Sequence, residues 1–330
     1  MEIIHKPVLL NQCLEYLSPV GEPYENNGLM IDSTLGEGGH TEAFLKHYKN
    51  LRIIGLDADP NIQARAKKRL SVFGERVNFH LGWFNDYFAN FSVKEERPDI
   101  ILFDLGISVF HYERSQRGFS FRKDEPLDMR LNPNTERTAA DLVNNLPAKQ
   151  IADILFLYGE ERNSKRISAA IEDARRKSRI ESAMDLADIV YRCVPAAYRH
   201  GAIHPATKTF QALRIAVNQE LKRLPQVLPL AFNVLKCGGK MGVITFHSLE
   251  DRIVKNYFRN LGKQCICPPE QPICICGGSP HGQILTRKPL LPTEAEVLEN
   301  SPSRSAKLRV VRKLRDVAPE SAKMIMPEDL

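Results

Sequence analysis

The segment MIDSTLGEGGHT, residues Met30–Thr41, decides the fold of this chain. It continues the apolar run Gly28–Ile31, which predicts a short buried strand that ends at Asp32. The glycines that follow let the backbone approach a ligand where a side chain would collide. A helix is expected next, from Thr41 to Tyr48. A strand, a glycine-rich loop and a helix in this order indicate the first unit of a nucleotide-binding sheet.

Three further strands of the same kind follow. Apolar runs at Arg52–Leu56, Val77–Leu81 and Asp99–Phe103 predict strands, and a helix is expected from Pro60 to Leu70 with proline in its tolerated first turn. Repeated strand–helix units with continuously apolar strands are typical of a parallel sheet that is covered on both faces. The predicted fold class is therefore α/β, a doubly wound sheet.

The repeating pattern stops after the fourth strand. Residues 109–134 have a loop-like composition, and helical patterning dominates from Ala139 to about Arg199. Two helices and two strands are expected later in the chain: Thr207–Leu224, Pro225–Lys236, Lys240–Phe246 and Lys307–Lys313. We expect one domain at 1–108 and 208–330, interrupted by a helical substrate-recognition domain at 109–207. Two consecutive domains are the alternative, but the strand that resumes near Lys240 favours an insertion.

The composition is that of a globular protein, with 43% hydrophobic and 26% charged residues. No apolar run approaches the roughly 20 residues of a membrane helix, and the N-terminus lacks the apolar core of a secretion signal. The expected location is therefore the cytoplasm, without a membrane partner. A net charge of +6 permits a nucleic-acid partner.

Basic residues gather in two segments. Such residues either contact RNA or form a charged surface that faces solvent, and the sequence does not decide between the two. The two clusters are Arg162, Lys165, Arg166, Arg175, Arg176, Lys177 and Arg179, and Arg304, Lys307, Arg309, Arg312, Lys313 and Arg315.

The glycine loop lacks one feature of dinucleotide sites. Counted from Gly36, the third glycine of G-x-G-x-x-G falls on Thr41, so the loop suits a ligand without a pyrophosphate. Asp57 ends the second strand 19 residues after Gly38, where an acidic side chain accepts hydrogen bonds from the ribose hydroxyls of an adenosine. A helix N-cap is the alternative role, which Asp59 fits better. An adenosine without a pyrophosphate indicates S-adenosylmethionine as the cofactor.

Two more features belong to this expected site. Trp83 and Phe84 follow the third strand, where they either sandwich an adenine or belong to the core. Asp104 ends the fourth strand, at the carboxyl edge where such sheets bind ligands.

The sequence resembles one known family nearly from end to end, the bacterial small-subunit ribosomal RNA cytosine-N4 methyltransferases (the MraW family). The resemblance is carried by HKPVLL at His5–Leu10, DSTLGEGGH at Asp32–His40, GLDADP at Gly55–Pro60, DLGIS at Asp104–Ser108, RGFSF at Arg117–Phe121, PLDMR at Pro126–Arg130, HPATKTFQALRIAVNQEL at His204–Leu221, FHSLEDRIVK at Phe246–Lys255 and SRSAKLRV at Ser303–Val310. It implies a class I methyltransferase fold with a helical insertion. The implied reaction is methylation of N4 of one cytidine in the decoding region of 16S rRNA, so the implied partner is the small ribosomal subunit.

The resemblance also implies cofactor contacts at specific positions, namely Gly38, Gly39, His40, Asp57, Phe84, Asp104 and His111. His111 departs from the family, which usually reads DLGVSSPQ where this chain reads DLGISVFH. An imidazole there replaces a glutamine amide, and it still donates or accepts a hydrogen bond.

The expected chemistry assigns roles to a few side chains. Cytosine N4 is a poor nucleophile because its lone pair is delocalised into the ring, and acceptors for its N–H groups favour reaction. Asp104 is the candidate to accept an amine proton or to hold the sulfonium end of the cofactor.

The target base must also be held out of its stack. Phe119 and Phe121 are candidate stacking partners, or else core residues. His204 and Ser248 are expected to line the same cleft, together with Glu250 and Asp251. The alternative is that HSLED begins a helix, with Ser248 as its cap.

Four cysteines lie close together near the C-terminus, as two C-x-C pairs: Cys265, Cys267, Cys274 and Cys276. C-x-x-C is the commoner zinc-binding spacing, and a cytoplasmic disulfide is disfavoured. The cluster is a candidate structural Zn²⁺ site.

Two other functions remain open at this stage. One is N-methylation of another nucleic acid, against which the absence of a Pro-Pro-aromatic sequence after Asp104 and the presence of HPATKTFQALR argue in the case of DNA. The other is a non-catalytic RNA-binding module, against which the complete glycine loop, Asp57 and Asp104 argue.

Overall fold

The computed structural model describes residues 6–21, 28–92, 94–201, 203–265, 267, 272–274 and 278–317. The chain divides after Gly106 and after Glu220 into two compact units. We call the discontinuous one the sheet unit and the inserted one, Ile107–Glu220, the helical unit. The helical unit thus extends to Glu220, whereas the sequence pattern placed the end of the insertion at residue 207.

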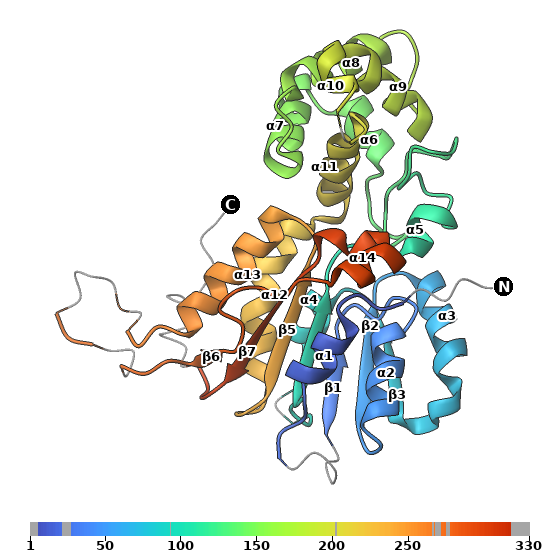
Figure 1. Cartoon of the computed structure of the whole chain (residues 1–330). Helices are drawn as coiled ribbons and strands as arrows, with labels where there is room; N and C mark the ends of the chain where they lie inside the picture. The colour runs from blue at the N-terminus through green and yellow to red at the C-terminus, as the bar shows by residue number, and fades with distance from the viewer. Residues whose placement is uncertain are drawn as a thin grey trace. The chain divides into compact units, whose positions relative to one another are not determined.

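The described residues of the sheet unit form a seven-stranded sheet in the order β3-β2-β1-β4-β5-β7-β6 (Figure 1). Its strands are β1 Leu29–Asp32, β2 Arg52–Asp57, β3 Val77–Leu81, β4 Ile100–Asp104, β5 Lys240–Thr245, β6 Gly282–Ile284 and β7 Lys307–Lys313. The first five strands are parallel, and β7 pairs antiparallel with both β5 and β6. The chain order reverses between β1 and β4, which is where doubly wound sheets bind their ligands. This arrangement confirms the expected α/β fold with a doubly wound sheet.

Helices cover the sheet on both faces because alternate strand residues point to opposite sides. The helices of this unit are α1 Leu10–Tyr16, α2 Gly39–His47, α3 Pro60–Leu70, α4 Phe84–Ala89, α12 Glu220–Val234, α13 Ser248–Leu261 and α14 Glu294–Glu299. On one face, Met30 and Leu102 share a buried cluster with Phe44 of α2. On the other, Phe103 packs against Phe88 of α4 with ring centroids 5.9 Å apart.

A buried lysine joins the last strand to α12. Lys313 is fully buried, and its Nζ donates hydrogen bonds to the carbonyls of Phe232, Asn233 and Leu235 at 2.8–2.9 Å. Burial lowers the pKa of this ammonium, and the carboxylate of Asp316 at 2.8 Å partly offsets that effect. The side chain therefore satisfies helix-end carbonyls that lack partners within α12.

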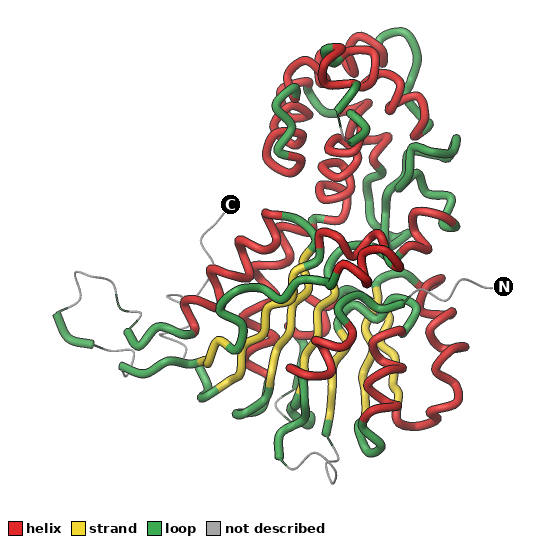
Figure 2. Tube along the Cα trace, viewed as in Figure 1, coloured by secondary structure: helices red, strands yellow, loops and turns green. Residues whose placement is uncertain are grey.

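The helical unit is built from short helices joined by loops (Figure 2). These helices pack around an apolar cluster of their own. Its helices are α5 Val109–Glu113, α6 Ala139–Asn145, α7 Ala148–Gly159, α8 Ser164–Arg175, α9 Ala183–Cys193, α10 Ala196–Arg199 and α11 Ala206–Asn218. Leu155 of α7, Ile167 of α8 and Leu213 of α11 meet in this cluster. The unit therefore has a core of its own.

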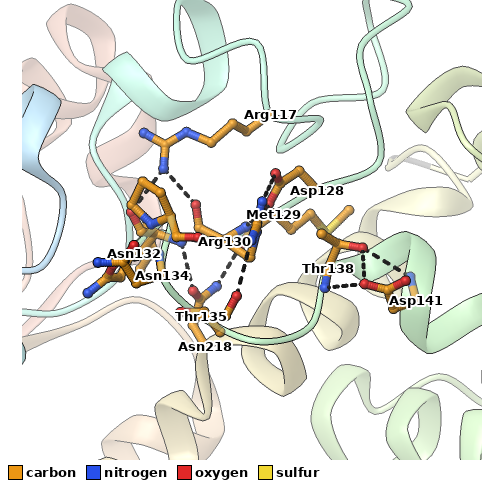
Figure 3. A network of polar contacts seen from close by, with 12 residues as sticks. Arg117, Asp128, Met129, Arg130, Asn132, Asn134, Thr135, Thr138, Asp141 and Asn218 are labelled. Carbon is orange, nitrogen blue, oxygen red and sulfur yellow. Dashed lines mark hydrogen bonds and ion pairs between the residues drawn. The ribbon is translucent and has the colours of Figure 1, made fainter.

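Polar side chains fix the loop before α6 (Figure 3). Asn218 is 1% exposed; its amide nitrogen donates to the Met129 carbonyl and its oxygen accepts from the Leu131 amide, both at 2.8 Å. Arg117 donates to the carbonyls of Arg130 and Leu131 at 2.7 and 2.9 Å. Arg130 itself forms a two-pronged ion pair with Asp128. Two of the motifs that carry the family resemblance, RGFSF and PLDMR, are thus tied together by main-chain contacts.

Two sequence-based boundaries differ from the structure. The helix predicted from Thr207 to Leu224 ends early in the structure. Gln219 adopts a left-handed conformation with φ of 52° and separates α11 from α12. α12 then runs through Pro225 and Pro229, which were expected to begin a helix. The short edge strand β6 was missed, because three residues give no alternation to detect. Among the described residues, no helix is long and apolar enough to cross a membrane.

Replacing Asn218 by alanine is expected to destabilise the helical unit by about 3 kcal/mol, because it leaves a buried carbonyl and a buried amide without partners. Thermal unfolding followed by circular dichroism measures this effect. Asn134→Ala, on the exposed part of the same loop, is the matched control and should unfold like the wild type. Equal unfolding temperatures for the two variants would contradict the role of the Asn218 amide.

Candidate active site

Three carboxylates end three neighbouring strands of the sheet unit. Asp32 ends β1, Asp57 ends β2 and Asp104 ends β4, and these strands pair in the order β2-β1-β4. Parallel strands end at one edge of a sheet, so the three side chains gather there. Burial raises the pKa of Asp32 to about 6, against the opposing effect of a 2.7 Å hydrogen bond from the Thr41 hydroxyl.

The glycine loop wraps around Asp57. One carboxylate oxygen of Asp57 accepts from the Gly36 amide and the other from the Asp59 amide, both at 2.9 Å. Burial nevertheless raises the pKa of Asp57 to about 7, although these two hydrogen bonds lower it. Asp59 caps α3 through a 3.0 Å hydrogen bond from the Asn61 amide. The structure thus assigns the cap to Asp59 and leaves the Asp57 carboxylate partly exposed at the sheet edge.

The two glycines expected at the cofactor are also required by packing. Gly38 has φ of +80°, and a Cβ there would lie 2.8 Å from a methyl of Leu70. A Cβ on Gly39 would lie 2.8 Å from Pro7. Gly36, with φ of +53°, has nothing closer than 3.9 Å to its Cβ position. The open side of the loop therefore lies at Gly36, and Gly38 and Gly39 present backbone only.

Asp104 is held by its main chain and carries a buried oxygen that lacks a partner. Its amide donates to the Thr34 hydroxyl at 2.6 Å, and its Oδ1 has no hydrogen-bond partner among the described residues. Burial raises its pKa well above the usual value, and the charges of Asp32 and Glu250 add to this effect. Such an orphaned acceptor is what a ligand with N–H or O–H donors would satisfy. Thr34, a residue that the sequence analysis did not single out, is the side chain that positions it.

His40 lies beside Asp104. The ring is 6% exposed, its Nε2 lies 2.9 Å from the Val8 carbonyl, and its Nδ1 lies 3.5 Å from the second carboxylate oxygen of Asp104. A nitrogen that faces a carbonyl must donate, so Nδ1 is the atom left to face Asp104. His40 therefore lies against the Asp104 carboxyl group and restricts its position by packing.

The aromatic pair after β3 does not form a sandwich. The rings of Trp83 and Phe84 are perpendicular, at 86°, with centroids 6.4 Å apart. One face of Trp83 is covered by the guanidinium of Arg223, 4.1 Å from the ring centroid. Phe84 packs edge-on against Phe103 at 5.6 Å. The expected insertion of adenine between Trp83 and Phe84 is therefore wrong, and Phe84 alone remains a candidate contact.

The helical unit gathers a stack of partly exposed rings. Phe121 stacks on His204 with centroids 4.5 Å apart, and His204 stacks on Tyr191 at 5.9 Å. The guanidinium of Arg199 lies 5.4 Å from the centroid of the Tyr191 ring. Sequence reasoning found Phe121 and His204 through their motifs. It missed Tyr191 and Arg199, which lie on α9 and α10 outside any motif.

Two other predicted site residues, Phe119 for the substrate base and His111 for the cofactor, are buried. Phe119 is 5% exposed and belongs to the core of the helical unit, so its expected role as a stacking partner for a base is wrong. His111 is 4% exposed and packs edge-on against Phe119 at 5.3 Å.

The start of α13 is built differently from the expected cap. His247, not Ser248, caps the helix in a capping box with Glu250, and Ser248 is the first helical residue. Asp251 forms a two-pronged ion pair with Arg309 of β7, at 2.7 and 3.1 Å. Glu250 and Asp251 therefore both hold α13 in place, and the charge of Glu250 also acts on Asp104.

The basic clusters separate into structural and solvent-facing members. Arg175 donates to the carbonyls of Val143 and Leu146, both at 2.7 Å, and so completes the end of α6. Arg309 and Lys313 of the second cluster are likewise buried and bonded. Arg162, Lys165 and Arg166 are exposed and form no ion pair among the described residues.

Three of the four cysteines lie together at the far end of α13. The thiols of Cys265, Cys267 and Cys274 are within 4.8 Å of one another. Cys276 lies outside the described residues.

The comparison with protein families and the comparison of sequences agree on one family. The model of the MraW methylase family matches residues 2–314. "Ribosomal RNA small subunit methyltransferase H" from Treponema denticola is 56% identical over 95% of this chain and 98% of its own length. The protein of that name from Treponema pallidum is 44% identical over 94% and 93%. Among solved structures, an rRNA methylase from Streptococcus thermophilus is similar with a TM-score of 0.40 and 8% identity, over 94% of this chain and 99% of that one.

The family model spans nearly the whole chain, and the relatives are similar over nearly their whole length. The chain belongs to the MraW methylase family.

Proposed function

We propose that this protein uses S-adenosylmethionine to methylate the exocyclic N4 of one cytidine in the decoding region of 16S rRNA. The names of its relatives support the RNA substrate and the reaction class. The observation that carries the proposal is the carboxylate edge of the sheet, where Asp57 and Asp104 end β2 and β4 beside a glycine loop.

The residues at this edge fit the cofactor. Asp57 offers a partly exposed carboxylate to two ribose hydroxyls, and the open side of the loop at Gly36 admits a ligand close to the backbone. When bound, S-adenosylmethionine supplies an electrophilic methyl group on a positively charged sulfur. Three crowded carboxylates with raised pKa values favour a cation, because a positive charge relieves their mutual repulsion. Gly38, Gly39 and Phe84 complete the candidate cofactor contacts.

Asp104 is the candidate catalytic residue. An exocyclic amine that accepts a methyl group gains positive charge at N4 and must then lose one proton. The orphaned Oδ1 of Asp104 accepts a hydrogen bond from N4, and its raised pKa suits a group that takes up a proton. His40 and Thr34 act as positioning residues, through the contacts described above.

The helical unit is the proposed RNA-binding part. The stacked rings of Phe121, His204 and Tyr191 resemble the aromatic surfaces on which unpaired RNA bases stack. Arg162, Lys165 and Arg166 of the same unit supply unpaired positive charge for phosphates. We also propose that His111 contacts the cofactor and that Ser248 contacts the substrate. The support for these two contacts is the family resemblance.

Two further expectations accompany this function. A substrate made of ribosomal RNA places the protein in the cytoplasm, with the small ribosomal subunit as its partner. Zn²⁺ at the cysteine cluster would have a structural role, because methyl transfer from a sulfonium to an amine needs no Lewis acid.

Asp57→Ala should lower the affinity for S-adenosylmethionine about tenfold or more, because hydrogen bonds to a charged group contribute about 1.5–3 kcal/mol. Isothermal titration calorimetry measures the affinity, and circular dichroism checks that the fold is intact. An unchanged affinity would refute the ribose role.

The affinity of the wild type should also rise with pH and level off above about pH 7. The raised pKa of Asp57 leaves it protonated below that value in the free protein, whereas the ribose hydroxyls need the ionised acceptor. Titrations between pH 5.5 and pH 8.5 (a range chosen to bracket the pKa of about 7) test this dependence. In Asp57→Asn the part of the rise that Asp57 contributes near pH 7 should vanish, and the changes that remain come from Asp32, near pH 6, and from Asp104, whose pKa is also raised. A wild-type profile that is flat across this range would contradict the model.

Asp104→Asn should reduce the rate of methyl transfer more than it weakens cofactor binding, since the hydrogen bond to N4 strengthens in the transition state. Single-turnover assays with small-subunit RNA give the rate, and calorimetry gives the affinity. Equal losses in both would assign Asp104 to cofactor binding alone.

The triple reversal Arg162→Glu, Lys165→Glu, Arg166→Glu should weaken RNA binding and flatten its dependence on salt, because each lost phosphate contact reduces the slope by about 0.7–0.9. Lys49→Glu, Lys67→Glu, Lys68→Glu, at exposed positions of the sheet unit, is the control with the same change of charge. Filter binding at several salt concentrations compares the two. If both triple variants bind alike, the cluster on the helical unit does not contact RNA.

A further inference from the structure

The cysteine cluster lies in a long excursion of the sheet unit that the methyl transfer does not use. The chain leaves α13 at Leu261 and returns at His281, just before β6. The amide of His281 donates to the carbonyl of Leu261 at 2.9 Å, so the two ends of the excursion are held together. Connections in compact domains have a median length of about 4–6 residues, and this one is several times longer.

The described residues of this excursion contribute nothing to an apolar core. Between Gly262 and Pro280, none of the described residues is buried, and the side chain of Ile273 is 73% exposed. The same described residues contain no helix or strand. The convergence of three cysteines within such a segment therefore does not follow from hydrophobic packing.

Two distances between these thiols are close to the edge length of a tetrahedral thiolate site. Sγ of Cys274 lies 3.9 Å from Sγ of Cys265 and 4.0 Å from Sγ of Cys267. A disulfide would require about 2.05 Å. Four sulfurs around a zinc ion at the usual bond length of about 2.3 Å lie about 3.8 Å apart along each edge of the tetrahedron.

The three cysteines come from both halves of the excursion. Cys265 and Cys267 lie on the part that leaves α13, and Cys274 lies on the part that returns toward β6. An ion bound by all three would thus cross-link the segment at its middle. Cys265 and Cys274 are exposed, so an ion in solution reaches them directly.

We propose that Cys265, Cys267 and Cys274 bind one Zn²⁺ ion as thiolates, and that this ion orders the excursion between α13 and β6. Each thiol releases its proton on binding, so three protons leave for each ion bound. Zinc is the metal of choice because soft thiolates in tetrahedral geometry select it, and no redox step is involved. The ion supplies a cross-link that the described residues of the segment do not obtain from apolar packing.

The test measures metal in the full-length chain. The protein is purified under reducing conditions, incubated with ZnSO₄, freed of unbound metal by gel filtration and analysed by plasma mass spectrometry. One zinc per chain is expected for the wild type. Cys265→Ser, Cys267→Ser and Cys274→Ser should each lose most of it, whereas Cys237→Ser, at an exposed cysteine outside the cluster, should keep it. A wild type without zinc, or serine variants that retain it fully, would overturn the proposal.

A second measurement does not depend on how the variants fold. Titration of the metal-free wild type with Co²⁺ should produce the intense near-ultraviolet bands of thiolate-to-cobalt charge transfer, and Zn²⁺ should displace them. Zinc should also raise the thermal unfolding temperature of the wild type by mass action, but not that of Cys274→Ser. The absence of charge-transfer bands would exclude thiolate ligation and refute the site.

Discussion

The gathering of three carboxyl groups, from buried to partly exposed, at one edge of a parallel sheet is the constraint around which the sheet unit is organised. Asp32, Asp57 and Asp104 end strands that lie side by side, and burial raises the pKa of each. Hydrogen bonds from the surrounding chain offset part of the free-energy cost of removing these carboxylates from water. The Thr41 hydroxyl donates to Asp32, and two backbone amides donate to Asp57. Of these three carboxyl groups, only that of Asp104 has a buried oxygen without a hydrogen-bond partner among the described residues. An edge of this kind favours a ligand that brings hydroxyl donors and a positive charge.

The fold and part of the site were predictable because their signals are local. Continuous apolar runs predict the long strands. Asp57 and Asp104 could be singled out because each ends one of these runs. The break at Gln219 was not predictable, because a left-handed glutamine leaves no mark in composition while the prolines of α12 point to the wrong boundary. Phe119 and Phe121 look alike in sequence, yet one is buried in the core and the other stacks on His204. That difference depends on tertiary packing.

Charge was the least informative signal in the sequence. Arg175 and Arg162 belong to one basic cluster, but the first completes the end of α6 and the second faces solvent. Lys313 is a strand residue that serves as the cap of a distant helix. A side chain that carries a positive charge is also a set of hydrogen-bond donors, and carbonyls without partners compete for it with any external anion. The position of helix ends in the folded structure decides whether a basic side chain binds such carbonyls or remains available for an external anion.

The discontinuity of the sheet unit has a consequence for biosynthesis. β4 is translated about 135 residues before β5, its neighbour in the sheet, because the whole helical unit comes between them. During that interval the nascent chain carries β1 to β4 with an unpaired edge, which is a template for wrong pairing or aggregation. The helical unit, with a contiguous sequence and its own core, is able to fold first, while the last element, β7, delivers Lys313 to α12 only at the end. Ribosomes that make this protein therefore hold an incomplete sheet for much of the elongation time, and slow translation of residues 107–220 would lengthen that vulnerable period.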